Sequence, residues 1–154
     1  MRAKLLLRQL TNIIACIGLV IFLCPQVKAQ DTGLLVVGNH KSVPSELKKF
    51  QLNSVLKGEK QRWDDGTKVV IALMEPDTPV GRNTCTRVYN MSANELQKHF
   101  LALVFQGKGR APNFFESVSE LEAFVAKTPG AIGVLERTSD NTLKTVLVDG
   151  KRNI

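Results

Sequence analysis

The stretch Lys127-Thr-Pro-Gly-Ala-Ile-Gly-Val-Leu-Glu136 marks a change from helix to strand. Pro129 ends a helix, because the residue before a proline is disfavoured in the helical region, and Gly130 permits a tight reversal. The apolar run Ala131-Ile-Gly-Val-Leu135 that follows is typical of a buried strand. Gly133 inside this run indicates that another part of the chain passes close to its backbone.

Two helices carry capping boxes at their predicted starts. Ser117-Val-Ser-Glu120 opens the helix before Pro129, whose apolar positions are Val118, Leu121, Phe124 and Val125. Ser92-Ala-Asn-Glu95 opens a second helix, whose apolar positions are Leu96, Phe100, Leu103 and Val104. Leu101 and Phe105 widen the apolar face of this second helix, which predicts that it packs deepest on the sheet.

Three other apolar runs predict strands. Leu34–Val37, Lys68–Met74 and Thr145–Asp149 are short, and the first is apolar throughout, as in a strand buried on both faces. Between the first two, Ser45 is a predicted cap for two short helices that end at Gly58. The residues predicted to form the core are Trp63, Ile71, Leu73, Phe100, Val104, Phe124, Ile132 and Val134.

Three further motifs precede the predicted helix and the Pro-Gly-Ala-Ile-Gly segment along the chain. They are Val55-Leu-Lys-Gly58, Trp63-Asp-Asp-Gly66 and Phe105-Gln-Gly-Lys-Gly-Arg-Ala-Pro112. Together these pieces resemble the phosphate-type substrate-binding proteins of bacterial ABC transporters, from Leu34 to Val148. The resemblance implies an α/β fold, a type 2 periplasmic-binding-protein lobe with a central mixed β-sheet flanked by helices. Relatives of full length have two such lobes that close over the ligand, and this chain has room for one.

The first 29 residues have the pattern of a secretory signal peptide, with a basic start, an apolar run over Ile13–Cys24 and a polar end. Cleavage after Ala29 is the expected outcome, which leaves a domain over residues 30–154 in the periplasm or outside the cell. An uncleaved anchor and a lipoprotein site at Cys16 are the alternatives. Four of the 21 basic residues and none of the 14 acidic ones lie in the leader, so the remaining 17 basic residues leave a net charge of +3. The sequence has no arginine cluster with interleaved aromatic residues, which is the pattern that would indicate nucleic-acid binding.

Export limits the chemistry of the cysteines. Of three cysteines, Cys16 and Cys24 lie in the leader, so Cys85 is the only one in the mature domain. It is either a reactive or bridging thiol or, as we expect, a small buried residue near a helix start. His40 and His99 show no spacing typical of a Cys-His hydrolase or of a metal site, so the sequence predicts neither an enzyme nor a cofactor.

The loop after the second long strand is the candidate ligand loop. It reads Glu75-Pro-Asp-Thr-Pro-Val-Gly-Arg-Asn-Thr84 and precedes a helix predicted to begin near its last two residues. A helix N-terminus has free N–H groups and a partial positive charge, so it favours an anion. By the resemblance, this loop matches an arginine, hydroxyl and glycine segment that grips phosphate. The residues matched to it are Asp77, Thr78, Gly81, Arg82 and Thr84, and Asn83 is a further ligand candidate in the same loop.

The loop departs from the family pattern at two positions. Glu75 stands where the family has an arginine, and Pro79 interrupts the run of hydroxyl residues. Arg82 is the expected replacement for the missing charge. The alternative is that Arg82 is a solvated residue of the first helical turn and that Thr84 is only a cap.

Polar residues after the first strand are further ligand candidates. Asn39, His40 and Ser42 follow Gly38, and in open α/β sheets ligands bind beyond the carboxyl ends of the strands. The alternative is an ordinary polar turn. The sequence therefore supports two functions: an exported solute-binding-like protein for phosphate or a similar oxyanion, and an interaction or structural module of the cell envelope without a small-molecule ligand. A homodimer or an envelope protein is the expected partner.

Overall fold

The computed structural model describes residues 33–138 and 142–154. The predicted signal peptide, its cleavage after Ala29 and the alternative lipid site at Cys16 lie outside these residues. Within the two described ranges, no helix combines the length and the apolar character needed to cross a bilayer.

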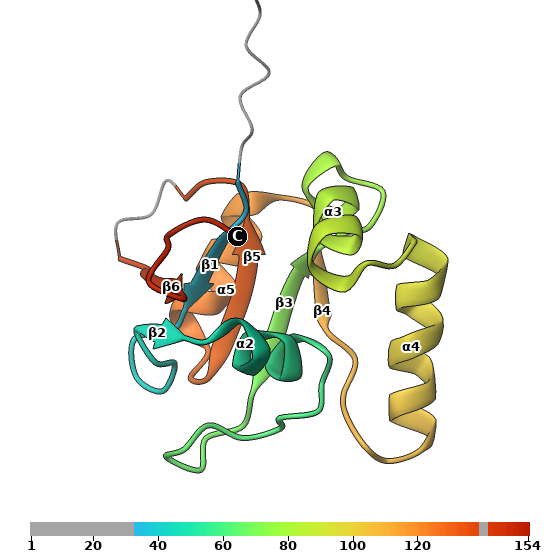
Figure 1. Ribbon diagram of the computed structural model, residues 1–154, viewed down its shortest axis with the longest axis horizontal. Coiled ribbons are helices and arrows are strands. Elements are labelled where there is room, and N and C mark those ends of the chain that lie inside the picture. The colour runs from blue at the N-terminus through green and yellow to red at the C-terminus, as the bar shows by residue number, and fades with distance from the viewer. Residues whose placement is uncertain (1–32, 139–141) are drawn as a thin grey trace, which may run out of the picture. The chain divides into compact units, whose positions relative to one another are not determined.

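Six strands form one mixed sheet (Figure 1). They are β1 (Leu35–Gly38), β2 (Glu46–Leu47), β3 (Val70–Met74), β4 (Asn113–Phe115), β5 (Ala131–Leu135) and β6 (Lys144–Val148). Their order across the sheet is β2-β6-β1-β5-β3-β4. The α/β fold and the mixed sheet expected from the sequence are confirmed, and the buried run Leu34–Val37 lies at the centre of the sheet.

The direction of β1 decides where the loops of the sheet lie. β3 runs parallel to β4 and to β5, whereas β1 runs antiparallel to both of its neighbours, β5 and β6. The carboxyl end of β1 therefore lies at the sheet edge opposite to the carboxyl ends of β3 and β5.

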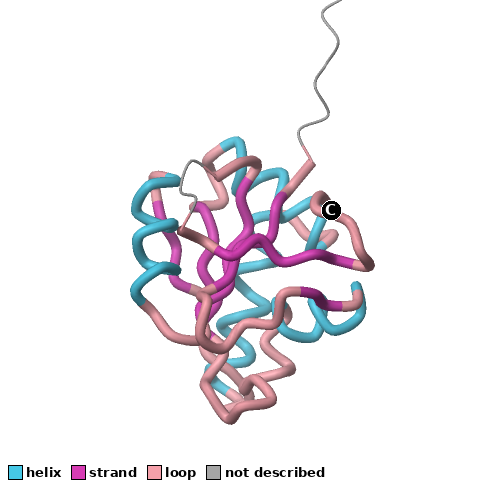
Figure 2. The backbone as a smooth tube through the Cα atoms, turned by 90° about the vertical axis from the view of Figure 1, so that its left-hand side faces the viewer, coloured by secondary structure: helices cyan, strands magenta, loops and turns pink. Residues whose placement is uncertain are grey.

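Helices cover both faces of the sheet (Figures 1 and 2). They are α2 (Lys49–Leu56), α3 (Pro79–Thr84), the π-helix η1 (Cys85–Tyr89), α4 (Ala93–Phe105) and α5 (Val118–Lys127). On one face, Leu121 and Val125 of α5 pack with Val37, Ala72 and Leu135. On the other, Leu52, Val55 and Leu56 of α2 pack with Val36, Leu73, Ile132 and Val134. The result is a layered α/β sandwich with a core on each side of the sheet.

The junction of α5 and β5 has the predicted structure. Ser117 caps α5 by accepting a hydrogen bond from the Glu120 amide at 3.3 Å, and Gly130 reverses the chain at φ +77°. A β-carbon on Gly130 would lie 2.2 Å from the Lys68 carbonyl oxygen, and one on Gly133 would lie 2.8 Å from Cδ2 of Leu121. The close approach predicted at Gly133 is confirmed, and the approaching group is a side chain of α5.

Trp63 fixes this junction to the loop before β3. Its indole Nε1 donates a hydrogen bond of 2.9 Å to the Gly130 carbonyl, and the side chain is buried. The Gly130 carbonyl also accepts from the Val70 amide at 3.1 Å, so the contact mainly satisfies the buried indole N–H, which would be costly to leave without an acceptor.

The start of α2 differs from the prediction. A two-residue strand, β2, and one helix replace the two helices expected after Ser45. Lys48 is the N-cap, and its amide donates to the Gln51 side chain at 2.9 Å. β2 is too short to show any periodicity in sequence. Gly58 ends the helical segment with φ +78°, as predicted.

The start of α3 also differs. The helix begins at Pro79, four to five residues before the predicted start near Asn83 or Thr84, and Thr78 is its N-cap. Proline suits the first helical position because its φ is already helical and its missing N–H is not needed there. Pro79 therefore begins a helix where we expected it to interrupt a loop.

The prediction that α4 packs deepest on the sheet is wrong. α4 joins the core through Leu96 and Phe100, and the Phe100 ring packs edge-on against Tyr89 of η1 with centroids 6.0 Å apart. In Figure 1 this helix stands apart from the strands. The helix with the most extensive contact with the sheet is α5, which packs against β5 and β3.

Most of the predicted core residues are buried. Those with at most 7% exposure are Trp63, Ile71, Leu73, Phe100, Ile132 and Val134. Phe124 is half-buried and packs against the α5 side of the core. Val104 is 45% exposed, so its prediction is wrong, because α4 turns only part of its wide apolar face inward.

Candidate anion-binding sites

The β3–α3 loop, which we define as Glu75–Thr84, begins where β3 leaves the sheet. The Glu75 amide donates to the Phe115 carbonyl at 2.9 Å, so the loop starts from a fixed point between β3 and β4. The Thr78 hydroxyl donates to the Glu75 carbonyl at 2.7 Å and accepts from the Gly81 amide at 3.0 Å. This hydroxyl, predicted to grip a ligand, is engaged in capping α3.

Gly81 and Thr84 have structural roles in the same loop. A β-carbon on Gly81 would lie 1.9 Å from the Glu75 carbonyl oxygen, so only glycine lets α3 pack against the end of β3. Thr84 is 2% exposed, and its hydroxyl donates to the Val80 carbonyl at 2.9 Å inside the helix. The Thr84 hydroxyl therefore makes no capping hydrogen bond at the start of η1, and it is not open to solvent.

The charged groups of the loop are mostly acidic. Arg82 is exposed, and its Nη1 donates to the Asp77 carbonyl oxygen. Asn83 donates from Nδ2 to a carboxylate oxygen of Glu136 at 2.8 Å. A guanidinium has five N–H donors, so Arg82 keeps donors for a ligand, whereas the carboxylates of Glu75, Asp77 and Glu136 repel an anion.

The residues after β1 lie at the other edge of the sheet. Asn39 is buried and donates from Nδ2 to the carbonyls of Val125 and Ala126, each at 2.9 Å. A ring nitrogen of His40 hydrogen-bonds the Thr142 carbonyl, and the Ser42 hydroxyl donates to Thr67 Oγ1 at 3.1 Å. Because β1 is antiparallel to β5, these three residues cannot share a ligand with the β3–α3 loop.

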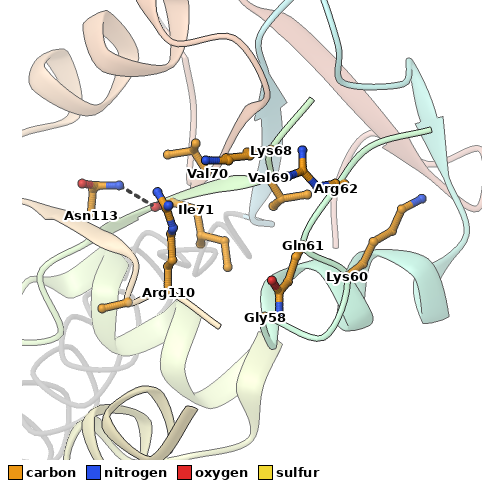
Figure 3. A pocket seen from close by; sticks show the side chains of 11 residues that line it. Gly58, Lys60, Gln61, Arg62, Lys68, Val69, Val70, Ile71, Arg110 and Asn113 are labelled. Atoms are coloured by element: carbon orange, nitrogen blue, oxygen red, sulfur yellow. Dashed lines mark hydrogen bonds between the residues drawn. The ribbon is translucent and has the colours of Figure 1, made fainter. Parts of the chain in front are cut away.

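A basic pocket that the sequence did not reveal lies at the amino ends of β3 and β4 (Figure 3). Its volume is about 460 Å³. Four cationic side chains line it, and none of its lining residues is acidic; the cations are Lys60, Arg62, Lys68 and Arg110. Lys60, Arg62 and Lys68 come from the α2–β3 loop and Arg110 from the α4–β4 loop, so no single sequence motif contains all four.

Two of the four cations, Lys60 and Arg62, are engaged by neighbouring groups of the protein. Lys60 pairs with Asp64 at 2.7 Å and points away from the pocket in Figure 3. Arg62 donates from Nη1 to the Gly66 carbonyl at 2.8 Å. Arg110 extends toward β3 beside Asn113, whose Nδ2 donates to the Ile71 carbonyl at 3.4 Å. Such donors suit phosphate or sulfate groups.

His, Cys, Asp and Glu side chains are the usual metal ligands and acid–base groups of proteins. Within residues 33–138 and 142–154, no three His, Cys, Asp or Glu side chains are grouped closely enough to hold a metal ion. Cys85 is buried, as expected, and its burial raises the pKa of the thiol. His99 hydrogen-bonds the Lys57 carbonyl at 3.1 Å through Nε2.

No protein-family model and no curated protein matches this chain. Solved structures do. A protein described as a phosphate ABC transporter substrate-binding protein with bound phosphate, from Clostridium perfringens, is similar over 79% of this chain, with 13% identity and a TM-score of 0.61. PstS from Borrelia burgdorferi is similar over 79%, with 14% identity and a TM-score of 0.58. An ABC-type phosphate transport receptor from Vibrio cholerae is similar over 79%, with 17% identity and a TM-score of 0.52.

These similarities establish the fold. The described sheet and helices have the architecture of transporter substrate-binding proteins, as the sequence resemblance predicted. The chain spans about half the length of these structures, 46% to 49% of each.

Proposed function

We propose that this chain is an exported, non-catalytic binding protein that takes phosphate or a similar oxyanion at the β3–α3 loop. The observation that supports it is the position of Arg82, an exposed arginine in α3 at the carboxyl edge of β3 and β5, in a fold shared with phosphate-transport proteins. Ligands of open α/β sheets bind beyond such carboxyl ends. In this proposal the protein works in the periplasm together with an ABC transporter, which the signal-like leader and the similarity in fold to phosphate-transport proteins support.

The binding by a monomer is weak in this proposal. The chain spans about half the length of the similar structures, and the hydroxyls of Thr78 and Thr84 are engaged within the loop. Each hydrogen bond to a charged group contributes roughly 1.5 to 3 kcal/mol, so losing three of them weakens binding by about three to six orders of magnitude. We expect a monomer to bind phosphate no better than roughly millimolar, and tighter binding to require a homodimer or another subunit.

Titration calorimetry with phosphate, combined with light scattering, tests this proposal. Arg82→Ala should abolish the phosphate signal, and Arg152→Ala, which removes an exposed arginine from the C-terminal segment, should leave it unchanged. Micromolar binding by a monomer would contradict the expectation that tight binding requires a second subunit. Absence of phosphate binding in every assembly state would contradict the oxyanion function.

A second candidate function is an interaction module, and the outer face of α4 favours it. Leu101 is 57% exposed, Val104 45% and Phe105 81%. These residues are three and four positions apart, so they form one apolar surface on the helix. A second copy of this chain is the partner we assign to it. Phe105→Ser should then reduce dimerisation in light scattering, and a monomeric wild type would reject this candidate.

A further inference from the structure

We propose that the basic pocket at the amino ends of β3 and β4 binds a small multivalent oxyanion, a ligand with two or more phosphate or sulfate groups. This site is separate from the β3–α3 loop and goes beyond the proposed function. It is built by Arg62, Lys68 and Arg110, with Asn113 beside them and Lys60 at its margin (Figure 3).

Charge is the first reason. Four lining cations and no lining carboxylate leave the pocket positive even after Lys60 is paired with Asp64. Like charges held around one cavity repel one another, and a bound anion replaces this repulsion with attraction. Arginine forms paired hydrogen bonds with phosphate and sulfate oxygens, so Arg62 and Arg110 favour these groups over chloride.

The size of the pocket is the second reason. Its volume of about 460 Å³ lies in the range of small-molecule sites and exceeds what one tetrahedral oxyanion fills. The cations come from two separate loops, so a ligand that contacts all of them needs anionic groups at more than one position. A multivalent ion satisfies this condition, and a single phosphate ion does not.

The backbone provides a rigid wall for the pocket. Val70 and Ile71 are held on one side by pairing with Ala131 and Ile132 of β5, while β4 pairs with β3 from Ala72 onward. At Val70 and Ile71, β3 therefore has no strand partner on the side of the pocket, because its pairing with β4 begins only at Ala72. Sites on such regular elements are held more precisely than sites made of loops alone.

The position of the pocket makes the two sites experimentally separable. The pocket lies at the amino end of β3, and Arg82 lies beyond the carboxyl end of the same strand. A substitution at Arg110 or Lys68 thus removes charge from the pocket without touching the β3–α3 loop. Both side chains are exposed, so neither is needed for the core.

Titration calorimetry with inorganic pyrophosphate and with phosphate tests the proposal. Pyrophosphate should bind at least about tenfold more tightly than phosphate, and Arg110→Ala and Lys68→Ala should each weaken pyrophosphate binding by about tenfold. Arg152→Ala is the matched control and should leave pyrophosphate binding within about twofold of wild type. Failure of the two proposals is distinguishable, because loss of phosphate binding in Arg82→Ala tests the β3–α3 loop, whereas loss of pyrophosphate binding in Arg110→Ala tests the pocket.

Amide chemical shifts locate the ligand. Pyrophosphate should shift the amide signals of Ile71, Arg110 and Asn113 more than those of the β3–α3 loop. Equal affinity for phosphate and pyrophosphate, equal weakening by Arg110→Ala and Arg152→Ala, or shifts spread over all basic surfaces would overturn the site. Binding of single-stranded DNA without binding of pyrophosphate would overturn it in favour of a polymer surface.

Discussion

Gly130 and Gly133 are three residues apart, and each excludes a β-carbon for a different reason. At Gly130 the added carbon meets a backbone oxygen at 2.2 Å and the φ of +77° is unfavourable for other residues. At Gly133 it meets the flexible end of Leu121 at 2.8 Å, which has room to adjust only at the expense of packing in α5. The backbone obstruction is the harder one to relieve.

This difference predicts an order of stabilities. Gly130→Ala should destabilise the protein more than Gly133→Ala, and Gly133→Val should cost roughly 1 to 3 kcal/mol through overpacking. Urea denaturation of the three variants measures the free energy of unfolding. An unchanged unfolding free energy for Gly133→Val would show that the contact with Leu121 is not restrictive.

Cys85 and Tyr89 predict how stability depends on pH. Burial raises the pKa of the Cys85 thiol above its ordinary 9.0, and burial, with a smaller effect from the Cys85 charge, raises the pKa of the Tyr89 phenol above its ordinary 10.0. Below these ordinary values both states hold the protons. Above them the unfolded chain releases protons first, so the unfolding free energy falls as pH rises.

Urea midpoints at about pH 8 and about pH 10.5 measure this effect. The midpoint should be lower at the higher pH, and the decrease should be smaller in Cys85→Ala and in Tyr89→Phe. Tyr89→Phe also removes the hydrogen bond of 2.9 Å to the Leu56 carbonyl, so its midpoint should be lower at both pH values. If the urea midpoint falls between the two pH values by as much in both variants as in wild type, Cys85 and Tyr89 are not the groups responsible.

At the scale of elements, α4 and α5 each begin with a serine N-cap, but their surroundings differ. The predicted capping box is complete in α4, whereas in α5 only the serine half of it is present. The Ser92 hydroxyl accepts from the Glu95 amide, and the Ser117 hydroxyl accepts from the Glu120 amide, both at 3.3 Å. Yet α5 packs directly on β5 and β3, whereas α4 contacts η1. Removing a cap should therefore have a local effect in α4 and a global effect in α5.

Hydrogen exchange checks this expectation. Ser117→Ala should lower the global unfolding free energy by about 1 kcal/mol, a usual value for a lost N-cap. Ser92→Ala should accelerate amide exchange within α4 while strand amides keep most of their protection. Equal loss of protection in the strands for both variants would mean that α4 unfolds only together with the sheet.

Elements with several agreeing local signals could be predicted from the sequence. A cap, an apolar period, Pro129 and Gly130 all indicate the α5–β5 junction, and the structure has it there. β2 and β4 have two and three residues, too few for a period, and form because longer strands offer an edge. Proline occurs both at the first position of helices and in loops, and the local sequence does not show which of the two applies to Pro79.

The candidate site was less predictable because it depends on strand direction. The apolar run at β1 has the same composition whether the strand runs with or against β5, so the sequence does not show that Asn39 and His40 lie at the opposite edge of the sheet from Arg82. The sequence also does not show whether a hydroxyl group is already hydrogen-bonded within the protein. Thr78 and Thr84 match a ligand loop by residue type, and only their hydrogen bonds show that both are used locally.

At the scale of the whole molecule, the leader predicts the form in which the protein works. The mature chain should begin at Gln30, because Ala29 and Val27 suit the positions before a signal-peptidase cut. Mass spectrometry of the intact exported protein measures this directly. A mass that retains the leader, or a lipid adduct at Cys16, would contradict it.

The position of β1 has a consequence for the order of folding. This strand is at the centre of the sheet, and its partners are β5 and β6, so Val36 pairs with Val134 and Val146. The central strand gains its hydrogen bonds only when nearly the whole chain is present, and closing such long loops slows folding. A nascent chain that ends before β5 lacks both partners of its central strand, so we expect it to stay unfolded, the state in which a polypeptide can pass through a narrow translocation channel.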